Sequence, residues 1–197
     1  MRLLATSPKA LRVSVDDALA VHKLGSGLWQ SLQHLPAAKL GLVALCIGTD
    51  RSTGDSLGPL TGSFLEELAC PDLEVIGTLD RPVHATNLQE TIYGLQKRTI
   101  KPCIIAIDAC LGRLDSVGKI SLAKGALNPG AGVNKDLPAV GDYHVMGIVN
   151  VSGFMEHLVL QNTRLHLVYR MAGVIAEAMA TVSFRLSASS SAAGKSP

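Results

Sequence analysis

Two aspartates are the residues of this chain best placed to do chemistry. Asp55 lies in CIGTDRSTGDSLGP and Asp108 in CIIAIDACLG, each after a run of apolar, partly β-branched residues, at 42–47 and 103–107. Such runs are typical of buried parallel strands. In an open α/β sheet, the carboxyl ends of the strands line the crevice where ligands bind. Two carboxylates brought together there could activate a water molecule or hold a metal ion.

The segment 48–55 is expected to form a loop ahead of a helix. Its glycines permit tight turns, and the free N–H groups at a helix start attract anions. The segment has neither a Walker lysine nor a GxGxxG pattern, which disfavours nucleotide binding. Asp55 could instead cap the helix that begins at Ser56, and one carboxylate oxygen can cap while the other does chemistry. Asp50, in the same loop, is a candidate for substrate binding.

Asp108 ends a strongly apolar run, so we expect its carboxyl group to be partly desolvated. Desolvation raises the pKa of a carboxyl group unless a partner compensates. The alternative is a structural role, in which loop amides hydrogen-bond the carboxylate. Asp80 and Asp115 also lie in predicted loops, where aspartates are common turn formers.

Two histidines are expected near the crevice or its rim. His84, in RPVHATN, and His144, at the start of a predicted strand, could each serve as a third metal ligand or transfer a proton. The chain has no HExxH motif and no close Cys/His cluster. Its four cysteines lack CxxC spacing, so we expect reduced, structural thiols; a reactive Cys110 beside Asp108 is the alternative.

Apolar periodicity predicts alternating strands and helices, and hence a three-layer α/β/α domain with a mostly parallel sheet. The predicted strands are 42–47, 73–79, 103–107, 118–123 and 144–151, with 118–123 antiparallel because its connection is short. The predicted helices are 15–35, broken near Gly25 and Gly27, then 56–68, 87–97 and 152–182, bent near Gly173.

A long Gly/Pro/Asn loop is predicted at 125–141, and loops of this length are often functional. Within it, the backbone N–H groups of Gly130, Ala131 and Gly132 could stabilise an oxyanion, since glycines let a backbone approach closely. The alternative is a turn-rich connection without a chemical role.

Composition favours one domain and excludes several classes of protein. Residues 1–186 are predicted to form a single domain, and the small, polar segment 187–197 to be a disordered tail. A net charge of +2 without a basic stripe argues against nucleic-acid binding. The longest apolar run, 40–48, is far short of the roughly 20 residues of a membrane span. With no recognisable signal peptide, we expect a soluble, cytoplasmic protein.

Five segments together resemble the YyaC-type family of sporulation proteins: CIGTDRSTGDSLGP, GTLDRPVHATNL, IIAIDACLG, LNPGAGVNKDLPAVGD and GIVNVSGFMEHLVLQNTRL. The resemblance extends in order from 41 to 179. More distantly, TGDSLGP, AIDA and NPGAGV resemble blocks of the spore germination protease. That enzyme is an atypical aspartic-type endopeptidase that degrades small acid-soluble spore proteins, and its fold resembles that of hydrogenase maturation proteases.

The resemblance implies that Asp55 and Asp108 match the two catalytic aspartates of the germination protease. Hydrogenase maturation proteases carry acidic residues at both places and add a histidine to bind nickel, and the resemblance assigns that histidine to no particular position of this chain. The chain also lacks most of the extra length of the germination protease. Neither zymogen control nor a tetramer is therefore implied.

Three hypotheses follow. The first is a sporulation-associated peptidase that needs no cofactor, in which Asp55 and Asp108 share a proton and act on peptides or proteins such as small acid-soluble spore proteins. The second is a metal-binding processing protease in which Asp55, Asp108 and His84 hold a divalent metal. The third is a non-enzymatic sporulation protein that binds peptides in the same cleft. The sequence leaves the oligomeric state open, a homo-oligomer included.

Overall fold

The computed structural model describes residues 10–33, 41–129 and 137–193. They form a six-stranded mixed sheet in the order β1-β5-β6-β4-β2-β3. Strands β3, β2, β4 and β6 are parallel to one another, whereas β5 is antiparallel to β6 and β1 is antiparallel to β5. The strands are β1 (Leu11–Ser14), β2 (Leu42–Cys46), β3 (Leu73–Ile76), β4 (Cys103–Gly112), β5 (Lys119–Lys124) and β6 (Tyr143–Val151).

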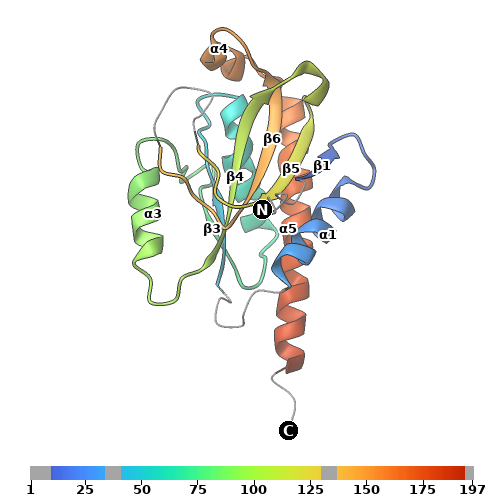
Figure 1. The fold of residues 1–197 in the computed structure, drawn as a ribbon, viewed down its shortest axis with the longest axis vertical. Helices are drawn as coiled ribbons and strands as arrows, with labels where there is room; N and C mark the ends of the chain where they lie inside the picture. Colours follow the sequence, from blue (N-terminus) through green and yellow to red (C-terminus); the bar gives the residue numbers. More distant parts are fainter. Residues whose placement is uncertain (1–9, 34–40, 130–136, 194–197) are drawn as a thin grey trace, which may run out of the picture.

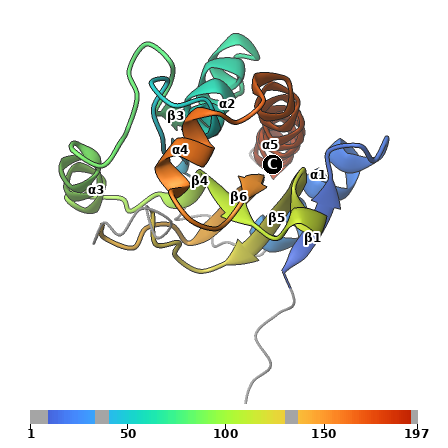
Figure 2. The ribbon, with the colours of Figure 1, turned by 90° about the horizontal axis from the view of Figure 1, so that it is seen from above.

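Helices cover both faces of the sheet, which confirms the predicted three-layer α/β/α fold. Figure 2 shows α1, α2 and α5 on one face and α3 on the other, and each face has its own apolar core. A short helix, α4, lies over the carboxyl ends of the central strands, at the top of Figure 1. The helices are α1 (Ala20–Leu32), α2 (Leu57–Glu67), α3 (Leu88–Gln96), α4 (Glu156–Gln161) and α5 (Leu165–Ala193), with 3-10 turns η2 (Gly54–Ser56) and η3 (Leu114–Ser116).

Strand β4 is longer than predicted, which changes the setting of Asp108. Its pairing with β2 ends at Cys46↔Ile107, but its pairing with β6 continues to Gly112. Asp108 therefore lies within β4, not at its end. It is nevertheless the first residue of β4 that no longer pairs with β2.

The first predicted helix is wrong at its start. Residues 11–14 form β1, and the helix begins only at Ala20. Helix α1 continues through Gly25 and Gly27. These glycines let the helix pack closely on its neighbours. A Cβ at Gly25 would lie 3.4 Å from the carbonyl oxygen of Ala178 in α5, and one at Gly27 would lie 2.4 Å from a methyl carbon of Leu11.

The last helical stretch also differs from the prediction. Its break falls at 162–164, between α4 and α5, and not at Gly173. Helix α5 continues to Ala193, so residues 187–193 are helical where a disordered tail was expected. Extending an existing helix through alanines and serines costs little, because only helix nucleation is unfavourable.

Helix α5 is also long and apolar enough, by composition alone, to span a membrane. The stretch 165–189 has 25 residues, and 56% of its most apolar 18-residue window is buried inside the fold. It contacts both α1 and α2. This is the setting of a core helix.

Candidate active site

Asp108 is placed by the end of the neighbouring strand. The N–H of Ile47 donates to the carbonyl of Ile107 (2.7 Å), and the chain then turns away from the sheet at Gly48. Gly48 has φ +145°, and a Cβ there would lie 1.9 Å from the carbonyl oxygen of Asp55. Asp108 thus lies at the carboxyl end of β2, as expected for a crevice residue.

Asp55 is brought to the same place because its loop folds back on itself. The N–H of Thr49 donates to the carbonyl of Asp55 (3.2 Å), which closes the loop 49–55. Asp55 lies in the 3-10 turn η2, which contacts β4. Ser56, and not Asp55, occupies the N-cap position of α2.

The environment of Asp108 favours its protonated form. Its side chain is buried, with 8% of the residue exposed. Burial raises the pKa of this carboxyl from 3.8 to about 8. The N–H of Ala109, which donates to Oδ1 (2.8 Å), opposes that rise in pKa, and the negative charge of Asp55 adds to it. The predicted desolvation is present; the alternative, hydrogen bonds from loop amides, is met only by one backbone amide, that of Ala109 in β4 itself.

The other aspartates are not part of this arrangement. Asp50, the predicted substrate-binding residue, is exposed at a turn of the loop. Asp80 and Asp115 are exposed and lie within 3.8 and 3.6 Å of Arg81 and Arg113, respectively.

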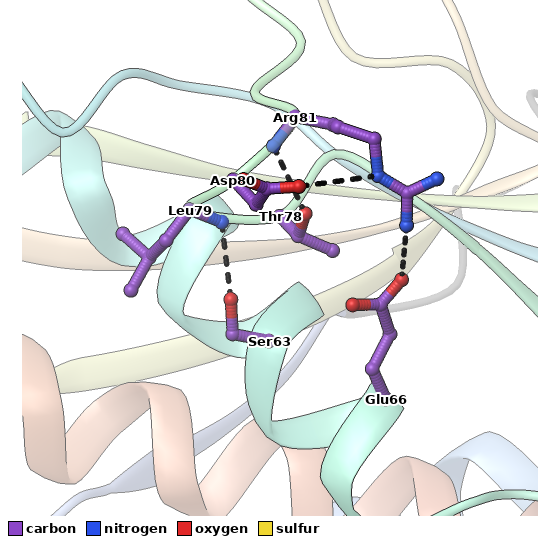
Figure 3. Close-up of polar contacts among 6 residues, drawn as sticks. All are labelled: Ser63, Glu66, Thr78, Leu79, Asp80 and Arg81. Carbon is purple, nitrogen blue, oxygen red and sulfur yellow. Dashed lines mark hydrogen bonds and ion pairs between the residues drawn. The ribbon is translucent and has the colours of Figure 1, made fainter.

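The loop after β3, which carries Asp80 and leads to His84, is fastened to α2 (Figure 3). The N–H of Leu79 donates to the hydroxyl of Ser63 (3.0 Å), and Arg81 pairs with Glu66 (2.8 Å). Further along, Val83 forms a bridge with Ile47, so His84 follows at the carboxyl end of the sheet, as predicted.

Within the ranges that the structure describes, His84 hydrogen-bonds only with residues close to it in sequence. Its N–H donates to Oδ1 of Asn87 (2.8 Å), and its ring Nδ1 lies 2.9 Å from the hydroxyl of Thr86. Among the described residues, no three His, Cys, Asp or Glu side chains are grouped to bind a metal. In the described part of the chain, Asp55, Asp108 and His84 are therefore not grouped as one set of metal ligands.

Two further expectations change or remain untested. His144 was expected near the crevice, but it lies at the amino end of β6, with Nδ1 2.8 Å from the carbonyl of Gly125. A parallel strand starts at the end opposite to the ligand crevice, which explains the error. Gly130, Ala131 and Gly132, the predicted oxyanion-binding loop, lie outside the described residues.

None of the four cysteines, all of them in the described part of the chain, forms a disulfide, as predicted. Burial and the charge of Asp108 raise the pKa of Cys110 to about 11, against a smaller opposing effect of Arg12. The Cys110 thiol is therefore protonated at neutral pH, which is the opposite of what a nucleophile requires.

The position of α4 at the site was not foreseen. Leu160 of α4 packs on Gly54, where a Cβ would lie 2.7 Å from a Leu160 methyl carbon. Asn150, in β6, donates to the carbonyl of Val159 (3.3 Å) and to the hydroxyl of Thr163 (3.2 Å). These contacts fix α4 beside the turn that carries Asp55. No periodicity in the sequence marks Asn150 for this role.

The comparisons with known proteins agree with this architecture. The family described as "Protein of unknown function (DUF1256)" matches residues 12–178. The uncharacterized protein YyaC of Bacillus subtilis (strain 168) is 54% identical over 167 residues, which are 85% of this chain and 80% of YyaC. The expected resemblance to YyaC-type proteins is thereby confirmed.

A solved structure shares the fold. The [NiFe] hydrogenase maturation protease HycI from Thermococcus kodakarensis KOD1 matches with a TM-score of 0.50 and 18% identity, over 74% of this chain and 94% of HycI. At that identity the likeness shows the fold alone. The predicted hydrogenase maturation protease-like fold is confirmed, while the more distant resemblance to the spore germination protease receives no support from these findings.

Proposed function

We propose that this chain, which belongs to the DUF1256 family, is a peptidase whose chemistry rests on Asp55 and Asp108. The observation that carries the proposal is that Asp108 is buried and has its pKa raised to about 8. The carboxylate of Asp55 is close enough to contribute to this rise. Strongly perturbed carboxyl groups in a crevice are typical of acid–base sites. The protease-like fold supports the same conclusion.

In this proposal the two carboxyl groups take different roles. Asp108, protonated at neutral pH, donates its proton to the carbonyl oxygen or to the amine of the scissile peptide bond. Asp55, which is more exposed than Asp108, accepts a proton from the attacking water. Two neighbouring carboxyl groups whose environments separate their pKa values make such a division of labour workable at neutral pH.

The biological setting and substrate are proposed from the resemblance to YyaC-type sporulation proteins. Small acid-soluble spore proteins are the first candidates, acted on in the cytoplasm. Hydrolysis by an aspartate pair needs no cofactor.

The test is an assay of the purified protein on small acid-soluble spore proteins, with cleavage products identified by mass spectrometry. Asp55→Asn and Asp108→Asn keep the side-chain shape but remove an acid–base group, which should lower the rate by about a hundredfold or more. Asp80→Asn is the matched control, because this carboxylate is 93% exposed. The rate should survive a chelator.

Loss of activity with a chelator and its recovery with nickel or zinc would favour a metal-dependent protease instead. If the wild type cleaves none of the spore proteins, the peptidase proposal fails for this substrate class. Unchanged activity in both asparagine variants would place the chemistry elsewhere.

A further inference from the structure

Beyond Ile107, no strand among the described residues pairs with the β2 side of β4, directly beside Asp108. Backbone groups of successive strand residues point alternately to the two neighbouring strands. The N–H of Cys103 and the carbonyl of Ile107 bond on the β2 side, whereas the carbonyl of Gly112 accepts from Ser152 on the β6 side. The backbone groups of residues 109 and 111 therefore face the side where β2 has ended.

These groups are largely unpaired. The N–H of Ala109 is taken by the carboxylate of Asp108. No helix, loop or side chain among the described residues hydrogen-bonds the carbonyl of Ala109 or the backbone of Leu111. Residues 109–112 are also partly exposed. We call this segment the β4 edge; its donors and acceptors match those of another extended polypeptide.

Exposed apolar side chains adjoin the same end of the sheet. The N–H of Ser152 donates to the carbonyl of Gly112 (2.8 Å), so β4 and β6 leave the sheet at one point. Leu114 follows Gly112 by two residues and is 80% exposed, and Phe154 follows Ser152 by two residues and is 92% exposed. The N-cap of α4 and its first turns add Met155 and Leu158, 54% and 44% exposed. We call these four side chains the α4 patch; Figure 2 shows α4 above the strand ends.

We propose that an extended, apolar segment of a polypeptide binds here, adding a strand to the β4 edge and packing its side chains on the α4 patch. The unpaired backbone groups select a polypeptide, and the patch selects apolar side chains. This proposal builds on the proposed function, because a strand placed beside residues 109–111 continues the line of β2 and passes Asp108. A second copy of the chain is a poorer occupant, since so short an edge offers few hydrogen bonds for a stable dimer.

The binding test uses the Asp108→Asn protein, whose side chain keeps an oxygen to accept from Ala109. Fluorescence anisotropy measures the Kd of a fluorescein-labelled ten-residue peptide rich in valine and leucine, and of the same peptide N-methylated at its six central residues. The unmethylated peptide should bind at least about tenfold more tightly, because methylation removes the donors that a strand needs.

A second arm tests the patch. Adding Phe154→Asp or Leu114→Asp should raise the Kd of the unmethylated peptide by about tenfold or more, as for loss of an apolar contact worth over 1 kcal/mol. Ile100→Asp is the matched control, because Ile100 is 65% exposed and lies away from the patch. The three positions are exposed, so the variants should fold, which circular dichroism checks.

Equal Kd values for the two peptides, or no effect of both patch variants, would overturn the docking inference even if wild-type protein cleaves spore proteins. Peptide binding that follows the expected pattern, with no cleavage of any substrate by the wild type, would leave docking standing and refute the peptidase. A wild-type dimer in light scattering that Phe154→Asp dissociates would identify a second copy as the occupant and overturn the proposal.

Discussion

Relative to the wild type, the Asp108→Asn protein should gain stability as the pH rises from 5 to 8. The folded chain keeps the Asp108 proton up to about pH 8, whereas the unfolded chain releases it near 3.8. Between these values the unfolded state binds fewer protons than the folded state. The contribution of Asp108 to the free energy of unfolding therefore falls as the pH rises through this window, and is fully lost only above about pH 8.

The size of the effect follows from the same two values. For each pH unit over which Asp108 is ionised in the unfolded chain but protonated in the folded chain, the free energy of unfolding falls by about 1.4 kcal/mol. From pH 5 to pH 8, the free energy of unfolding of the wild type should thus fall by about 4 kcal/mol relative to that of Asp108→Asn. The amide keeps the shape of the carboxyl group and does not titrate. Its oxygen can still accept from the N–H of Ala109.

The assay is urea denaturation of both proteins at pH 5, 6, 7 and 8, with the difference in unfolding free energy plotted against pH. Taking the difference cancels groups that titrate equally in both proteins. Asp80→Asn serves as the control and should give a flat line, since its carboxylate is exposed. A flat or falling line for Asp108→Asn would show that Asp108 is ionised in the folded protein, and the acid role proposed for it would be refuted.

Three more outcomes follow from the structure. A methyl group at Gly58 would lie 2.1 Å from the carbonyl oxygen of Ile47, so Gly58→Ala should lower the free energy of unfolding, measured by urea denaturation, by about 1–3 kcal/mol. Gly173→Ala is the control, because a methyl group there would have nothing within 4 Å. This control should leave the free energy of unfolding unchanged or raise it by up to about 1 kcal/mol. Peptidase activity should fall as the pH rises through about 8, because Asp108 then loses the proton that it donates; a constant rate from pH 7 to pH 9 would contradict this. Deleting residues 188–197 should leave the thermal midpoint nearly unchanged, since Ala188 and Ser189 are exposed; a drop of many degrees would show that the end of α5 docks on the fold.

The sequence predicts those strands whose signal is local. Residues 42–46 and 103–107 are buried by helices on both faces of the sheet, so each reads as a continuous apolar run. Strand β1 has only four residues at the sheet edge and depends on its pairing with β5, more than a hundred residues away. The extension of β4 through Ala109–Gly112 likewise depends on β6, because alanine and glycine have little preference for strands.

For the candidate site, the sequence predicts where along the sheet the residues lie better than it predicts which groups surround them. Asp55 follows β2, and Asp108 lies in the neighbouring strand β4 just where its pairing with β2 ends, so their meeting at one sheet end follows from the parallel topology. The surroundings of His84 follow from the path of a loop held by Ser63 and Glu66, which no spacing in the sequence indicates. The same holds for α4, which Asn150 ties to the strand end.

The early end of β2 explains the whole arrangement. Gly48 adopts a backbone angle that side chains disfavour, and it leaves room for the carbonyl of Asp55. That turn removes the backbone partner of β4 beyond Ile107 and returns Asp55 toward Asp108 in one step. If β2 ran on beside β4 to Gly112, the β4 edge would be paired and could not take another strand. The early end of β2 is therefore the feature on which both the acid–base pair and the proposed peptide-binding edge depend.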